Sequence, residues 1–149
     1  YPAELPIDGK TIAITRANLK RFDQAGGKVR VALETHDRYS TAARCLELFR
    51  KLHRTLPIVW DAHNSCYAGE TLEESYKLLK EYIVEIHAKD SVAEPDGRRR
   101  AVPPGEGDFP LARLEQLIAG SAAPFTLEYE RMWERELPPL AAALEKLLK

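Results

Sequence analysis

Residues 82–90, Tyr-Ile-Val-Glu-Ile-His-Ala-Lys-Asp, contain a short apolar run that ends at His87 and passes directly into a polar cluster. Three other apolar runs end in the same way: residues 29–34, 57–61 and 124–128 close on Glu34, Asp61 and Glu128. Stretches with the apolar periodicity of amphipathic helices separate the four runs. This alternation of strands and helices is typical of parallel βα units.

The predicted helices lie before, between and after the four strands. Helical spacing predicts one over about 10–25, one after an N-cap at Ser40, one after a Thr71/Glu74 capping box, one from Pro110 and one at the C-terminus. A long loop is expected over 91–108, because Pro and Gly recur in it. The run Arg98-Arg99-Arg100 inside that loop is interpreted as a solvated charge run.

The count of one leading helix plus four βα units predicts an α/β fold equal to half of a closed barrel. An eight-unit (β/α)8 TIM barrel takes about 250 residues, and this chain has 149. We therefore expect residues 1–149 to form a single partial domain. Apolar parallel strands need cover on both faces, which predicts another half-barrel as partner, either an N-terminal half or a second copy in a homo-oligomer.

Composition narrows the class of protein further. A formal net charge of -1 argues against a nucleic-acid-binding surface, which needs a basic face. No apolar stretch approaches the roughly 20 residues of a membrane span, and no signal-peptide pattern opens the chain. Cys45 and Cys66 form neither a disulfide framework nor a zinc spacing. These features predict a cytoplasmic protein that binds neither nucleic acid nor membrane.

The residues that end the four strands are the candidate functional site. Catalytic side chains of βα barrels lie at the carboxyl ends of the strands, so Glu34, Asp61, His87 and Glu128 are expected to converge. Three carboxylates and one imidazole form a ligand set for a divalent metal. An acidic residue after a strand is often only the N-cap of the next helix, but four ligand-type residues in succession favour a metal site.

At these positions the chain resembles the xylose-isomerase-like family of sugar isomerases and epimerases. The matching segments are Ala32-Leu-Glu34-Thr-His36, Val59-Trp-Asp61-Ala-His63, Ile86-His87-Ala-Lys89-Asp90, Gly105-Glu-Gly107-Asp108 and Leu127-Glu128-Tyr-Glu130-Arg-Met-Trp133. The resemblance runs from about residue 10 to the end and implies strands five to eight of a (β/α)8 barrel. It also implies that Glu34, Asp61, His87 and Glu128 bind one divalent metal, Mn2+ or Mg2+ in many members and Zn2+ or Co2+ in some.

The resemblance implies isomerisation or epimerisation of a small sugar, or of a sugar phosphate. Such a reaction moves a proton on a carbon next to a carbonyl, and the metal polarises that carbonyl and stabilises the enediolate. Glu34 and Glu128 resemble the family's paired acid and base, one removing the proton and the other returning it.

Residues beside the four ligands are candidates for binding substrate or supporting a ligand. Many family members carry Asp-x-x-His after the sixth strand, whereas here Asn64 replaces that histidine and His63 stands one place earlier. The substrate-binding candidates are His63, Asn64, Lys89 and Asp90. The alternative for His63 is support of a ligand, and the alternative for Lys89 and Asp90 is a local ion pair. His36 and Glu130 are expected to support the ligands from behind. Gly105 and Gly107 allow a tight turn, and a phosphate nest there is the open alternative.

Three other functions remain to be weighed. Dehydratases of inositol-type keto sugars share the fold and the single metal. Apurinic endonucleases share the barrel but need further metal ligands after the seventh strand, and residues 91–110 contain no histidine. The third alternative is a half-barrel fragment without activity of its own, since activity is expected to require the N-terminal half.

Overall fold

The structure is a computed structural model that describes residues 6–26, 29–132 and 134–147. Its contacts divide the chain into two compact units, Tyr1–Ile86 (unit 1) and His87–Lys149 (unit 2). Strand β3, Ile83–Ala88, begins in unit 1 and ends in unit 2. The expectation of one partial domain over 1–149 stays a prediction.

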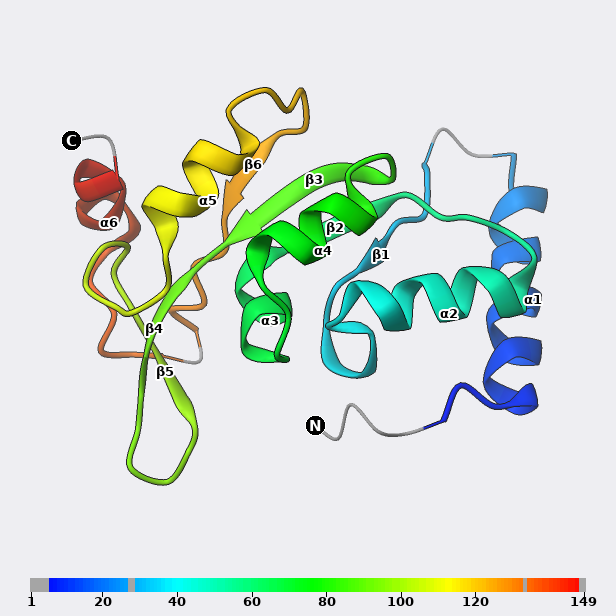
Figure 1. Ribbon diagram of the computed structural model, residues 1–149, viewed down its shortest axis with the longest axis horizontal. Helices are drawn as coiled ribbons and strands as arrows, with labels where there is room; N and C mark the ends of the chain where they lie inside the picture. The colour runs from blue at the N-terminus through cyan, green and yellow to red at the C-terminus, as the bar shows by residue number, and fades with distance from the viewer. Residues whose placement is uncertain (1–5, 27–28, 133, 148–149) are drawn as a thin grey trace. The chain divides into compact units, whose positions relative to one another are not determined.

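Unit 1 alternates helices with parallel strands, as the sequence predicts (Figure 1). Its elements are α1 (Gly9–Gln24), β1 (Leu33–Glu34), the 3-10 helix η1 (Asp37–Tyr39), α2 (Ala42–Leu52), β2 (Ile58–Asp61), α3 (Ala62–Tyr67), α4 (Leu72–Leu79) and the start of β3. Strands β1 and β2 are parallel, with Leu33 opposite Ile58 and Glu34 opposite Val59. The residues that end these two strands therefore lie at the same end of the sheet.

The core of unit 1 forms around Trp60 on β2, which is fully buried. Its indole N–H donates to Ser75 Oγ on α4 at 3.0 Å, and its ring lies 5.4 Å from the ring of Tyr76. This hydrogen bond removes the cost of burying the polar indole nitrogen. Cys45 on α2 is also buried, and burial together with the nearby Glu70 carboxylate raises the pKa of its thiol to about 12. The thiol is thus a core group rather than a nucleophile.

The helix ends of unit 1 follow their capping residues. Thr71 and Glu74 form the predicted capping box of α4. The predicted N-cap of α2 at Ser40 is wrong by one residue, because Thr41 accepts the hydrogen bond from Arg44 N. Glu70 adds a second cap to α2, since its carboxylate accepts from Ala42 N at 2.8 Å.

Unit 2 continues from the end of β3 with a hairpin, a helix, a strand and a final helix. Its elements are β4 (Asp90–Ala93), β5 (Arg99–Val102), α5 (Leu111–Ile118), β6 (Phe125–Leu127) and α6 (Leu140–Leu147). Strand β6 is the sheet neighbour of β3, and Glu128 N donates to Ala88 O at 2.9 Å. Leu114 on α5, Phe109 and Ala143 on α6 are buried and belong to the core of this unit.

The loop expected over 91–108 is wrong for residues 91–102, which belong to a β-hairpin. Strands β4 and β5 pair antiparallel, from Asp90 opposite Val102 to Ala93 opposite Arg99. The turn between them contains Pro95-Asp96-Gly97, with Gly97 at φ +83°, which is the chemistry that a tight turn requires. The arginine run lies at the start of β5 rather than in a loop, while Arg98 and Arg100 are exposed to solvent as expected and pair with Asp96 and Glu94.

The α/β fold with a parallel sheet is confirmed, and two of its elements, β1 and α3, differ from expectation. The first strand is only Leu33–Glu34, because the hydrogen bonds to the β2 segment run from Leu33 N to Pro57 O and from Thr35 N to Val59 O. Helix α3 was not predicted, since its six residues are too few for an apolar period. None of the helices in the described ranges is long and apolar enough to cross a membrane.

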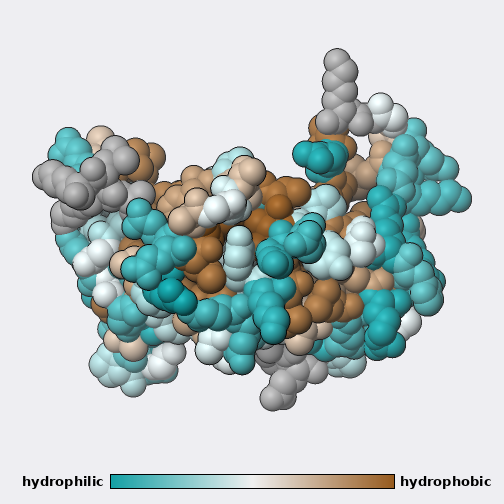
Figure 2. Space-filling view, turned by 45° about the horizontal axis from the view of Figure 1, so that its top comes forward, coloured by the Kyte–Doolittle hydropathy of each residue, from teal (hydrophilic) through white to brown (hydrophobic). Residues whose placement is uncertain are grey.

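Apolar surface remains exposed on both units, and Figure 2 shows hydrophobic side chains on the face that it presents. In unit 1 the ring of Phe22 on α1 is 55% exposed, and in unit 2 Phe125 on β6 and Met132 are 43% and 76% exposed. A cavity of about 220 Å³ in unit 1 opens between α1 and β1, beside Leu19, Phe22 and Leu33. Large exposed apolar groups are typical of surfaces that another segment covers.

Candidate active site

The ends of β1 and β2 are tied together by Thr35, a residue that sequence reasoning missed. Thr35 is fully buried; its hydroxyl accepts from Asp61 N at 2.8 Å and donates to Asp61 O at 3.1 Å. These two hydrogen bonds fix the residue after Glu34 against the residue that ends β2. The position of Thr35 directly after a strand-end carboxylate was the only signal in the sequence.

Asp61 takes the N-cap role that was the alternative to metal ligation. Its side chain is fully buried, and Oδ1 accepts from Asn64 N at 2.8 Å, which makes it the N-cap of α3. The Asn64 side-chain amide donates to Thr35 O at 3.1 Å and thereby ties α3 to the end of β1. The cap accounts for one Asp61 oxygen, so ligation of a metal by Asp61 and substrate binding by Asn64 stay predictions.

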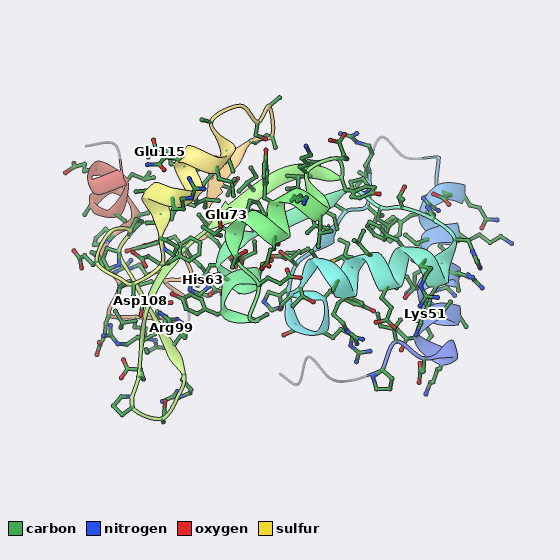
Figure 3. All side chains as sticks on the ribbon, in the orientation of Figure 1. Lys51, His63, Glu73, Arg99, Asp108 and Glu115 are labelled. Atoms are coloured by element: carbon green, nitrogen blue, oxygen red, sulfur yellow. The ribbon has the colours of Figure 1, made fainter. Side chains whose placement is uncertain are left out.

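The two histidines near these strand ends lie in different surroundings. His63 on α3, labelled in Figure 3, is buried. Its ring meets that of Tyr67 edge to face, with the ring centroids 4.6 Å apart. The His36 side chain is half exposed, and its Nδ1 lies 3.2 Å from Asp37 Oδ2. His63 is therefore the better placed of the two to take part in a shielded site, while the supporting role of His36 stays a prediction.

The ends of β3 and β6 in unit 2 bring three predicted site residues together. His87 Nδ1 lies 3.9 Å from Glu128 Oε2, and Lys89 Nζ lies 3.0 Å from the same oxygen. All three side chains are mostly shielded from solvent, with exposed fractions of 20% for His87, 22% for Glu128 and 12% for Lys89. A carboxylate between an imidazole and an ammonium can accept hydrogen bonds, bind a cation or move a proton.

Asp90 is the organising carboxylate of the loop that follows the hairpin. It is 2% exposed, and it accepts backbone N–H groups from Ser91, Gly105, Gly107 and Phe109 at 2.8–3.2 Å. Four donors offset the cost of burying a charge. We call Asp90 with the segment 103–109 the Asp90 cradle. The cradle accounts for Asp90 structurally, and a role in substrate binding stays a prediction.

Gly105 and Gly107 serve the cradle for different reasons. Gly105 has φ +82°, a left-handed conformation that favours glycine. A Cβ on Gly107 would collide with the Asp90 carboxylate and lie 2.5 Å from Ser91 O, so this position has no room for a side chain. Both N–H groups point at the chain's own carboxylate, so the alternative of a phosphate nest is wrong.

A second layer of contacts braces the cradle against the hairpin. Arg99 on β5 donates from Nε to Ser91 Oγ at 2.7 Å and from Nη2 to Ser91 O at 2.9 Å, and it pairs with Asp108. Figure 3 shows Arg99 and Asp108 side by side. Asp108 N in turn donates to Ser91 O at 3.1 Å. The middle residue of the arginine run is therefore a structural part of unit 2.

Gly107→Ala is expected to lower the free energy of unfolding by about 1–3 kcal/mol, because the added methyl group displaces the Asp90 carboxylate or the backbone. The measurement is denaturant unfolding followed by circular dichroism. Gly120→Ala is the matched control, since no atom lies within 4 Å of a Cβ built there. Equal stability of the two variants would contradict the close approach at Gly107.

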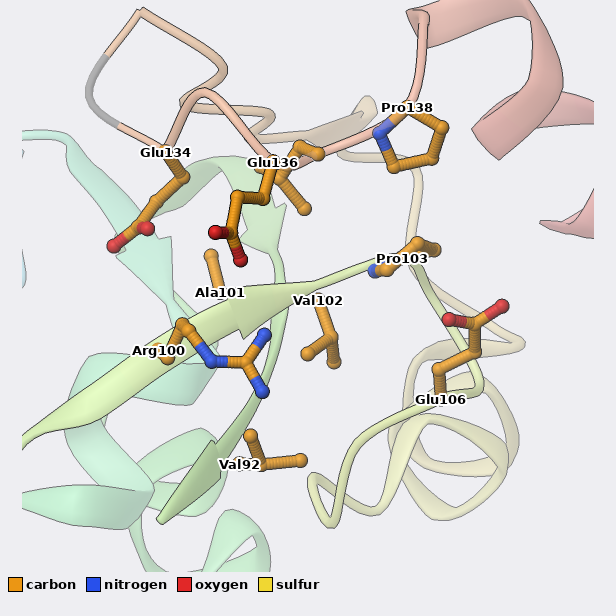
Figure 4. A pocket seen from close by; sticks show the side chains of 10 residues that line it. Val92, Arg100, Ala101, Val102, Pro103, Glu106, Glu134, Glu136 and Pro138 are labelled. Atoms are coloured by element: carbon orange, nitrogen blue, oxygen red, sulfur yellow. The ribbon is translucent and has the colours of Figure 1, made fainter. Parts of the chain in front are cut away.

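Two cavities of unit 2 differ in whether they adjoin the candidate site. A small cavity of about 10 Å³, room for a single water molecule, adjoins Lys89, Glu128 and Glu130. Glu130 thus shares this cavity with Glu128, and its supporting role stays a prediction. A larger cavity of about 420 Å³ is lined by Arg100, Glu134 and Glu136 among others (Figure 4). None of the predicted site residues lines it among the described residues.

Comparison with solved structures places the fold. The chain is similar to the probable 3-DHS dehydratase AsbF from Bacillus anthracis (TM-score 0.71, 22% identity, 93% of this chain and 55% of that one). It is also similar to a xylose isomerase domain protein from Planctomyces limnophilus (0.69, 21%, 99% and 55%) and to a D-psicose 3-epimerase from Clostridium cellulolyticum H10 (0.59, 17%, 95% and 57%). The chain therefore spans about half the length of these proteins.

Comparison with sequence families gives the same result independently of the structure. A search of curated proteins finds no significant match. The sequence model of the family described as "xylose isomerase-like TIM barrel" matches residues 10–149, which is nearly the whole chain. The predicted resemblance is thus confirmed, and the chain belongs to the xylose isomerase-like TIM-barrel family.

Proposed function

We propose that this chain supplies the C-terminal half of a metal-dependent sugar isomerase or epimerase, which acts by proton transfer next to a carbonyl. The observation that carries the proposal is the approach of His87 and Glu128 at the ends of β3 and β6. Family membership adds support, because active sites of TIM barrels lie at this end of the strands.

The proposed metal ligands are the four residues at or next to the ends of β1, β2, β3 and β6, which are Glu34, Asp61, His87 and Glu128. The donor set fits a divalent ion, because carboxylate oxygens suit Mn2+ and Mg2+ while the imidazole also accepts Zn2+ or Co2+. Glu34, His87 and Glu128 are half-buried, which leaves them accessible to an ion while reducing competition from water. Because Asp61 Oδ1 caps α3, ligation by Asp61 would use Oδ2.

The chain's own residues carry the proton transfer in this proposal. A bound divalent ion would polarise the substrate carbonyl and make the neighbouring C–H bond more acidic. Glu128 takes up or returns the proton, and Glu34 does the same on the opposite face of the sugar. Lys89 beside Glu128 stabilises the ionised carboxylate through its positive charge.

Replacing His87 is expected to weaken Mn2+ binding by the complete protein more than about 100-fold, because a ligand is lost, and even supporting residues contribute 10- to 100-fold. The measurement counts bound Mn2+ by electron paramagnetic resonance in wild type and His87→Ala. His53→Asn is the control, because His53 is exposed at the end of α2 in a left-handed conformation that asparagine tolerates. Equal Mn2+ binding in His87→Ala and wild type would refute the metal site.

The type of reaction is decided by product analysis. Three matched structures carry epimerase in their titles, and one is titled a probable 3-DHS dehydratase. Epimerisation in D2O keeps the substrate's elemental formula but replaces one C–H with C–D, so the mass rises by about one dalton, whereas dehydration removes one water. Mass spectrometry after incubation in D2O separates the two outcomes.

A further inference from the structure

Lys89 occupies an unusual place in unit 2, because it is the single residue between two strands. Strand β3 ends at Ala88 and β4 begins at Asp90. The Lys89 side chain is only 12% exposed, although a lysine loses much side-chain freedom and hydration when it is buried. Its ammonium lies 3.0 Å from Glu128 Oε2, within the range of a charge-assisted hydrogen bond.

The backbone on both sides of Lys89 is fixed by hydrogen bonds. On one side, Ala88 O accepts from Glu128 N at 2.9 Å, which joins the end of β3 to the residue that follows β6. On the other side, Asp90 is held by the four N–H groups of the cradle. The direction of the Lys89 side chain is therefore set by the fold rather than by its contact with Glu128 alone.

We propose that Lys89 is a built-in cation of the site, which the Asp90 cradle aims at Glu128 and which sets how tightly the divalent metal binds. This inference rests on the proposed function, because it takes Glu128 as a metal ligand. Lys89 is a positioning residue here: it holds the Glu128 carboxylate in place before the metal arrives and then opposes the metal's charge.

The sign of the effect follows from electrostatics. An ammonium in contact with a ligand carboxylate partly neutralises its negative charge, so that carboxylate attracts a metal ion less strongly. The ammonium also repels the positively charged metal ion directly. Removing the ammonium should therefore tighten metal binding, whereas removing a ligand loosens it. Opposite signs at Lys89 and Glu128 distinguish a charge that opposes the metal from a residue that merely supports the fold.

The test compares Mn2+ dissociation constants of the complete protein by calorimetric titration, without substrate. Lys89→Met is expected to bind Mn2+ about three- to tenfold more tightly than wild type, while Lys89→Arg, which keeps the charge, stays within about twofold. Glu128→Gln is expected to bind at least about tenfold more weakly. Lys77→Met on the exposed face of α4 is the matched control and should leave the constant unchanged.

The cradle is tested by Asp90→Asn, which keeps the side-chain shape. The variant loses the negative charge and replaces one of the two oxygens that accept the four N–H groups with an NH2 group. This variant is expected to shift the Mn2+ constant in the same direction as Lys89→Met by a smaller factor. A wild-type constant in Asp90→Asn would remove the cradle from the positioning role. If Lys89→Met yields too little folded protein, Lys89→Gln carries the same expectation.

The outcomes separate this inference from the proposed function. Mn2+ binding by wild type that is unchanged or weaker in Lys89→Met overturns the role of Lys89 and leaves the metal site standing. Binding that is seen only in Lys89→Met supports the inference, because the ammonium then excludes the metal from Glu128. No binding by wild type or by either Lys89 variant overturns both.

Discussion

Glu128→Gln is expected to slow exchange of the substrate's α-hydrogen with solvent deuterium by about a thousandfold. The amide keeps the size of the side chain but cannot take up the proton at neutral pH, and loss of a general base costs about 10²- to 10⁴-fold. The probes are the ketohexoses D-tagatose and D-fructose, because each has a carbonyl next to a C–H bond that the proposed reaction would exchange. The measurement is proton NMR in D2O with the complete protein.

The control for this variant is Glu115→Gln, which makes the same change on the exposed surface of α5 (Figure 3). Its exchange rate should equal that of wild type. Near-normal exchange in Glu128→Gln, with wild-type exchange detectable on either sugar, would remove Glu128 from the acid/base role. Glu34→Gln gives the parallel test of the second carboxylate.

The parallel strands could be predicted from the sequence because a buried strand is a short apolar run with a definite end. The third strand was expected over 82–87 and is observed as Ile83–Ala88, so the placing of His87 at its end holds. The first strand was expected over six residues but is Leu33–Glu34 only. Strand length depends on which backbone groups of the neighbour are available, and a single apolar run does not contain that information.

The hairpin and the cradle could not be predicted because their determinants are contacts between distant residues. Pro95-Asp96-Gly97 signals a turn, but the flanking strands are polar on one side and resemble a loop. Gly107 looks like a residue needed for conformational freedom. The structure gives a different cause, the close approach of the Asp90 carboxylate from 17 positions earlier. A similar long-range contact, Thr35 with Asp61, orders the ends of β1 and β2.

The sequence indicated which candidate site residues stand at strand ends, but it did not indicate which other residues they contact. Ligand-type residues at strand ends follow from periodicity, which indicates where each strand stops. The contact of Lys89 with Glu128 required the pairing of β3 with β6, and the Asp61 cap required helix α3. Lys89 and Asp61 therefore each have a structural partner in the fold. From the sequence alone, such a structural role could be stated only as an alternative to a functional one.

Residues 1–149 purified alone are expected to self-associate or to require a second half-barrel. Phe22 in unit 1 and Met132 in unit 2 are more than half exposed, and β1 has a sheet neighbour on one side only within the described part of the chain. Leaving about 400 Å² of apolar surface in water costs about 10 kcal/mol at 25 cal/mol per Å². That is comparable with the roughly 5–15 kcal/mol that stabilises a whole domain.

The measurement is sedimentation velocity of the isolated chain, followed by co-expression with an N-terminal (β/α)4 half from a family member. We expect a mass of at least twice 16.8 kDa for the chain alone and a defined complex with the added half. Phe22 lines the cavity between α1 and β1. Replacing Phe22 with Ser should therefore weaken association if a second copy or the added half covers that cavity. A monodisperse 16.8 kDa monomer with a cooperative thermal transition would show that the exposed apolar side chains need no cover.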